Sequence, residues 1–151
     1  MARPFSLQPL LDLMQTRTDE ASRQLGALIA AENDAKSRLQ MLEQYRDEYA
    51  ERLRNAAAQG LTLTTLNNYQ EFLKRIDEAI AQQALAVQQS AAGTAHGQQH
   101  WQAQNTRLKA IDTLSTRHQR QEQQAENRRE QKLLDEFSAR KFFLDPDSDK
   151  E

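Results

Sequence analysis

The sequence has no cysteine, only four glycines and three prolines, and no long apolar run. Without cysteine it can form neither a disulfide framework nor a thiolate metal site, and it suits a reducing compartment. No stretch of about 18 apolar residues could span a bilayer, and residues 1–11 lack the apolar core of a secretory signal. These absences predict a cytoplasmic protein without direct membrane insertion.

An excess of basic residues is also missing. The 20 Lys and Arg residues are set against 22 Asp and Glu, for a net charge of -2. Phosphate and anionic lipid attract proteins that carry a basic excess, so we expect protein partners and no nucleic acid. Residues 125–129 resemble the basic region of a leucine-zipper factor, but they follow the coiled-coil pattern, and acidic residues interrupt them.

Catalytic and metal-binding patterns are scarce. His96 and His100 have the spacing of a two-histidine metal site, but no carboxylate or cysteine shares their helical face. His118 is isolated from the other histidines, so no acid/base pair with an orienting partner can be named, and the chain contains no phosphate-binding loop or nucleophile motif. We therefore expect no catalytic residues, no cofactor and no metal site, and predict that the protein is not an enzyme.

What the sequence does contain is a helical repeat. With 38% hydrophobic residues, 28% charged residues and a mean hydropathy of -0.90, it can bury a thin seam but not a thick core. Apolar positions alternate four and three residues apart from Leu7 to Ala56, which predicts a coiled coil. The polar exceptions are Thr18, Glu32 and Arg46. We interpret them as positions that fix the register, with packing by Tyr45 in place of Arg46 as an alternative.

A second repeat runs from Leu66 to Ile111, after a glycine, Gly60, that is suited to end the first helix. Ser6 can cap the first helix, and Thr62 or Thr64 the second. A turn this short requires antiparallel helices, so facing residues have numbers that sum to about 122 and Leu25 faces Gly97. Residues 115–132 of the second helix contain no large apolar side chain, so we expect the first helix not to pack on this stretch.

The predicted fold is therefore all-α: a long antiparallel two-helix coiled coil, or helical hairpin, with a C-terminal single-helix overhang. We expect a single domain over 1–151. It comprises helix one at about 7–57, a turn at about 58–63, helix two at about 64–141 and an acidic tail at 145–151.

Two groups of apolar residues exceed what this seam requires. Phe72 and Ala79 widen the stripe of the second helix and face Leu42, Tyr45 and Tyr49. They either pack over the flank of the seam or form an exposed docking surface. Leu133, Leu134 and Phe137 lie on the overhang, which is either a solvated helix or a segment that docks into a partner.

Three sequence runs carry a family resemblance. Residues 41–49, 68–73 and 125–137 resemble, in the same order, those of the FliJ family of the bacterial flagellar type III export apparatus. The resemblance implies a protein that binds the export ATPase FliI hexamer and promotes its assembly. It also implies contact with the cytoplasmic domain of the export-gate protein FlhA, and recycling of export chaperones. The implied location is the inner face of the cell membrane at the flagellar base, by peripheral association.

The resemblance also implies a gate-binding surface at Phe72, Ile76 and Ala79, to which we add Leu42, Tyr45 and Tyr49 from the face opposite. We predict the ATPase-docking end on the overhang, where apolar side chains lack cover; it comprises Arg128, Arg129, Leu133, Leu134 and Phe137. Gln83 and Arg38 depart from the histidine and glutamine expected from relatives. The alternative function is a structural coiled-coil spacer or scaffold without a motor partner.

Overall fold

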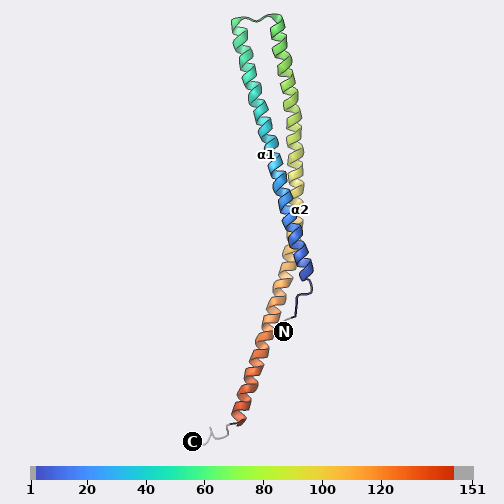
Figure 1. The fold of residues 1–151 in the computed structure, drawn as a ribbon, viewed down its shortest axis with the longest axis vertical. Coiled ribbons are helices and arrows are strands. Elements are labelled where there is room, and N and C mark those ends of the chain that lie inside the picture. Colours follow the sequence, from blue (N-terminus) through green and yellow to red (C-terminus); the bar gives the residue numbers. More distant parts are fainter. Residues whose placement is uncertain (1–2, 145–151) are drawn as a thin grey trace. The chain divides into compact units, whose positions relative to one another are not determined.

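Two long helices make up the structure, a computed structural model that describes residues 3–144 (Figure 1). Helix α1 spans Gln8–Gln59 and helix α2 spans Leu63–Leu144. No strand occurs within residues 3–144. The all-α, antiparallel two-helix fold is confirmed. The expected helix stop and acidic tail at 145–151 lie outside the described residues.

Local signals set the ends of both helices. The N–H of Gln8 donates to the carbonyl of Phe5 at 3.0 Å, and Pro9 lies in the first turn of α1, where its missing N–H has no helical acceptor. Gly60 ends α1 with a φ of 98°, a backbone conformation that glycine adopts without strain. Thr62 caps α2, because its Oγ1 accepts from the N–H of Thr65 at 3.2 Å.

The chain divides into two compact units, which are described separately. Unit 1 comprises residues 1–17 and 105–151, and unit 2 comprises residues 18–104. Both helices contribute to both units.

In unit 2, contacts across the helix pair confirm the expected register. The Oγ1 of Thr94 donates to the carbonyl of Leu28 at 3.3 Å, and these two residue numbers sum to 122. A Cβ added to Gly97 would meet Leu28 at 2.5 Å and Leu25 at 3.6 Å, so Gly97 allows close approach of the helices. The expected pairing of Leu25 with Gly97 is therefore present, with Leu28 even closer.

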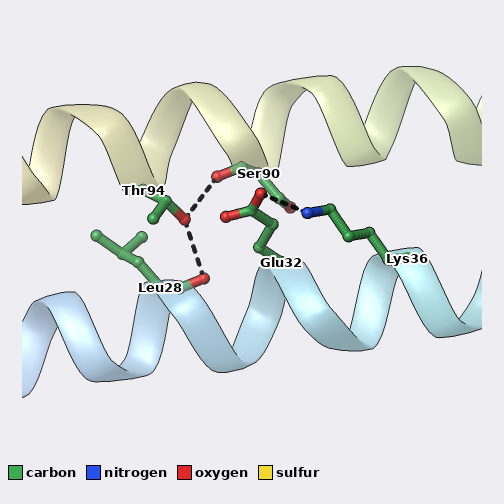
Figure 2. A network of polar contacts seen from close by, with 5 residues as sticks. All are labelled: Leu28, Glu32, Lys36, Ser90 and Thr94. Atoms are coloured by element: carbon green, nitrogen blue, oxygen red, sulfur yellow. Dashed lines mark hydrogen bonds and ion pairs between the residues drawn. The ribbon is translucent and has the colours of Figure 1, made fainter.

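A polar layer interrupts the seam of unit 2 at the expected exception Glu32. Figure 2 shows Glu32 paired with Lys36, whose Nζ lies 3.1 Å from the carboxylate, beside Thr94. The Oγ1 of Thr94 lies within reach of both the Leu28 carbonyl and, at 3.1 Å, the Ser90 carbonyl, and its one hydrogen serves a single acceptor at a time. The hydrogen bond with Thr94, and after it the one with Lys36, lowers the pKa of the Glu32 carboxyl. This position is therefore polar and satisfied, as a register-fixing position requires.

The other two exceptions differ from each other. Thr18 is buried, and Arg46 forms an ion pair with Asp77 on the opposite helix, which raises the pKa of the Arg46 guanidinium. Tyr45 also packs on α2 through Phe72, so both residues proposed for this position contact the opposite helix.

In unit 1, the first part of α1 packs on α2, and Met14 and Ser115 are buried. We expected the intramolecular cover of α2 to end near Ser115. Instead, the segment before α1 continues it: Arg3 and Phe5 contact His118, and Arg3 also contacts Glu122. Periodicity could not reveal this contact, because the segment is not helical.

Candidate functional site

The predicted site residues fall into two groups, one in each unit. Those expected to bind the gate lie in unit 2, on both α1 and α2, whereas those expected to bind the ATPase lie in unit 1, all on α2. The two groups differ in their surroundings.

Four aromatic rings form a cluster in unit 2. This aromatic cluster consists of Tyr45, Tyr49, Tyr69 and Phe72. The ring of Tyr49 lies 4.6 Å from that of Phe72 and 5.2 Å from that of Tyr69, between ring centroids, and Tyr45 meets Phe72 edge to face at 6.3 Å. Such pairs stabilise a fold by about 0.5–1.5 kcal/mol each beyond the burial of their area. The cluster thus joins α1 to α2.

The same aromatic cluster also presents a surface. Phe72 remains 36% exposed and Tyr45 43% exposed, while Tyr49 beneath them is half-buried. Burial, and after it the neighbouring Tyr69 and Tyr45, raises the pKa of the Tyr49 phenol. Flank packing and exposure, which the sequence posed as alternatives, therefore occur together.

An open groove of about 620 Å³ adjoins the aromatic cluster through Tyr45. Its lining comprises Arg38, Met41, Leu42, Gln44, Tyr45, Glu48 and Gln83. Met41 is 68% exposed, and Gln83 is held in place because its Nε2 donates to the carbonyl of Ala35 at 3.0 Å. The groove therefore combines apolar side chains with charged and amide groups at its edge, a composition suited to binding a protein segment.

Sequence reasoning missed Met41, although a signal was present. It lies four residues before Tyr45 on α1, so both side chains share a helical face outside the main seam. The two departures from the family pattern, Arg38 and Gln83, both line this groove.

Not every residue expected to bind the gate offers surface. Ile76 is only 6% exposed and belongs to the core of unit 2, and Ala79 is half-buried. Ile76 lies one helical turn after Phe72 on α2 and contributes little area to a partner. Phe72, Tyr45 and Met41 supply more exposed apolar surface.

The second group lies on a part of α2 with a different environment. Leu133, Leu134 and Phe137 are all exposed, the last by 67%. Arg129 pairs with Glu126 at 3.8 Å and, with Leu133, borders a groove of about 330 Å³. Within residues 3–144, no residue of another helix is recorded against this stretch, so its apolar side chains remain available for a partner.

The exposed apolar surface continues to the end of the described chain. Phe142, Phe143 and Leu144 are more than two thirds exposed. Leu144 lies seven residues after Phe137, which is four after Leu133, so these three share one face of α2. We name Leu133, Phe137 and Leu144 the docking stripe. Sequence reasoning did not assign Leu144 to the site.

Among residues 3–144, no three His, Cys, Asp or Glu side chains cluster to hold a metal ion. His96 and His100 are exposed on α2. Neither α1 nor α2 has, over these residues, the sustained apolar character needed to cross a bilayer.

Comparison with known proteins identifies the family. The model of the family described as "Flagellar FliJ protein" matches residues 3–146. A flagellar FliJ protein of Salmonella typhi is 32% identical over 97% of this chain and all of the relative, and that of Escherichia coli (strain K12) is 31% identical over the same shares. With a match that spans both helices and both candidate surfaces, the chain belongs to the flagellar FliJ family.

Proposed function

We propose that this protein is a non-catalytic component of the flagellar type III export apparatus that links the export ATPase to the export gate. Its partners are the FliI hexamer, whose assembly it promotes, the cytoplasmic domain of FlhA, and export chaperones that it recycles. It works in the cytoplasm at the inner face of the membrane, held there by protein contacts. Membership of the flagellar FliJ family supports this role.

One observation carries the proposal: the chain presents two exposed apolar surfaces of different construction in separate units. A linker needs two separate surfaces, because one surface can bind only one partner at a time. A spacer requires only a well-covered seam, and exposed aromatic rings would give it an aggregation hazard without a function.

The docking stripe is the surface we assign to FliI. Leu133 and Phe137 lie four residues apart on an unpaired length of α2, with Arg128 and Arg129 close by. An apolar stripe of this kind is stable in water only as part of a largely polar helix, and it gains most by burial in a partner. Arg128 beside it can pair with a carboxylate of the partner, whereas Arg129 already pairs with Glu126.

The aromatic cluster and its groove are the surface we assign to FlhA. Rings already packed on one another, such as Phe72 on Tyr49, lose little conformational entropy on binding. Met41 and Leu42 add adaptable apolar contacts beside the rings. The surface is therefore largely preformed, as an efficient protein interface requires.

Two matched substitutions test the proposal. Leu133→Asp should weaken stimulation of FliI ATP hydrolysis and leave FlhA binding within about twofold, while Phe72→Asp should do the reverse. An interface anchor typically contributes about 2 kcal/mol, so each affected affinity should fall about thirtyfold. Gln131→Asp and Gln70→Asp, both at exposed positions, are the controls.

Circular dichroism must show that each variant stays helical. A spacer would neither stimulate FliI nor bind the FlhA domain, and either negative result with the unaltered chain would remove that partner from the proposal. If both variants lost both activities while folded, the two surfaces would not have separate roles.

A further inference from the structure

The segment before α1 lies against α2 in unit 1. We name residues 3–7 the N-terminal strap. The Nε2 of His118 lies 2.8 Å from the carbonyl oxygen of Arg3, and because a carbonyl only accepts, the imidazole N–H donates. The backbone N–H of Arg3 donates to Oε2 of Glu122 at 3.3 Å. The ring of Phe5 packs on His118 with centroids 5.5 Å apart.

These contacts extend the cover of α2 beyond the point where α1 begins. Ser115 is buried, and Glu122 and Ala125 are half-buried, whereas every residue from 126 to 144 is exposed. A groove of about 450 Å³ runs between the N-terminal strap and α2 as far as Glu126. The strap therefore covers the last protected section of α2 before the docking stripe.

The strap and the docking stripe share one face of α2. Glu126 lies four residues after Glu122 and seven before Leu133, and these spacings return a helix to the same face. Arg129 lies on this face too, seven residues after Glu122 and four before Leu133, so it is about 10 Å from Glu122 along the helix axis. A protein packed on Arg129 and Leu133 is itself about 10 Å across even as a single helix, so it would reach the strap.

The N-terminal strap is held by few contacts. Its two hydrogen bonds to α2 involve exposed groups, and one ring pair is the only aromatic contact of the strap within the described residues. Its backbone bonds, from Gln8 to Phe5 and from Leu11 to Leu7, join it to α1 and not to α2. Segments with few buried apolar contacts open at a small fraction of the cost of global unfolding. The strap can therefore leave α2 without disturbing the rest of unit 1.

From this shared face and weak attachment, we propose that the N-terminal strap is a latch that competes with the partner of the docking stripe. When it is closed, it blocks one end of the docking face of α2, and full binding requires its displacement. This proposal rests on the proposed function, in which that partner is FliI. It predicts that the closed fraction of the strap lowers the apparent affinity for FliI.

The test uses one variant that opens the strap and one that locks it. Phe5→Ala removes the ring contact with His118, and Ser6→Ala, at an exposed neighbouring position, is its control. For the lock, Arg3→Cys and Gln119→Cys are combined and joined by a flexible bis-maleimide. Both residues line the groove, the recorded contacts of Arg3 use only its backbone, and the described chain has no other cysteine.

Phe5→Ala should bind FliI about threefold more tightly than the unaltered chain, because affinity scales with the open fraction. The linked double variant should bind at least about fivefold more weakly than the same variant before linking. Bound FliI should also slow the linking reaction, since it holds the strap open. Ser6→Ala should bind as the unaltered chain does.

Equal binding by the linked and unlinked forms, or weaker binding by Phe5→Ala, would overturn the latch while leaving the proposed function intact. If the unaltered chain did not bind FliI, the proposed function would fail, and the latch with it. An unchanged linking rate in the FliI complex would also overturn the latch, because it would show a strap that stays closed.

Discussion

The aromatic cluster of unit 2 and the docking stripe of unit 1 both expose apolar side chains of α2, but they do so for different reasons. Phe72 is exposed on one side and packs on Tyr49 on the other. Phe137 is exposed without a recorded contact to another helix of the described chain. Exposure alone therefore does not reveal what an apolar residue does. The exposed ring of Phe72 also stabilises the fold of unit 2, whereas the exposed ring of Phe137 has no such part in the fold of unit 1.

This difference has a consequence for mutational experiments. A substitution in the aromatic cluster changes stability and binding together, so binding data need a stability control. A substitution in the docking stripe should change binding alone. The following predictions test that distinction, starting with the largest expected effect.

The largest effect should come from the core of unit 2. Ile76→Asp should lower the free energy of unfolding by more than about 3 kcal/mol, because truncating a buried isoleucine already costs about 2–5 kcal/mol and a buried carboxylate adds a desolvation cost. Chemical denaturation followed by circular dichroism measures this change. Lys74→Asp, on the exposed side of the same helix, should cost within about 0.5 kcal/mol. Similar losses in both variants would show that Ile76 is not a core residue.

The two phenylalanines give the most direct comparison of the units. Phe72→Ala should destabilise the fold by about 1–2 kcal/mol, since it removes ring contacts with Tyr45 and Tyr49. Phe137→Ala should change the free energy of unfolding by no more than about 0.5 kcal/mol. Chemical denaturation of both variants measures these two changes, because a shift in midpoint at an unchanged m-value reports a change in the free energy of unfolding. An equal cost for the two would mean that Phe137 has an intramolecular partner or that the rings of unit 2 contribute nothing.

Glycine substitutions probe the helix contact within unit 2. Gly26→Ala should stabilise the protein by about 1 kcal/mol, because alanine favours the helix and nothing lies within 4 Å of the added Cβ. Gly97→Ala should gain less or lose stability, since its Cβ would lie 2.5 Å from Leu28. Thermal melts of the two variants give the comparison. A gain at Gly97 as large as that at Gly26 would contradict the close helix approach.

The polar layer predicts a pH dependence that belongs to unit 2. Because its partners lower the pKa of Glu32, the ionised carboxylate stabilises the folded state. That contribution is fully present above the ordinary carboxyl pKa and is lost as the pH falls through the lowered pKa. The melting temperature of Glu32→Gln should therefore approach that of the unaltered chain as the medium is acidified. In a Thr94→Ala background, Glu32→Gln should change the melting temperature by less. If the difference in melting temperature between Glu32→Gln and the unaltered chain widened in acid, the stabilising role of the Glu32 carboxylate would be refuted.

The smallest change in the free energy of unfolding should come from a truncation of the C-terminal part of α2. Removing residues 127–151 should change the free energy of unfolding by no more than about 0.5 kcal/mol, because the described part of this segment packs on no other helix. The helical signal should fall with the lost residues. A marked drop in the melting temperature would show that the end of α2 stabilises the hairpin, and would undo the contrast between the units.

The sequence predicted much of this fold because its signals are local and repeated. The alternating spacing identified the seam, Gly60 and Thr62 marked the turn, and the short turn fixed the register that the Thr94 and Leu28 contact shows. It also identified the apolar residues outside the seam. It could not divide them into packed and unpacked groups, since that depends on which side chains meet across the helix pair.

The sequence by itself determined the two helices, their antiparallel pairing and the apolar character of both candidate surfaces, because helical periodicity and turn chemistry act over a few residues. Only the tertiary structure placed Ile76 in the core, left Met41 exposed beside a groove, and brought Arg3 to His118, 115 positions along the chain. The physical reason is that a repeat reports which face of a helix is apolar. It carries no information about a non-helical segment that lies across that face, since such a contact depends on the arrangement of distant parts of the chain.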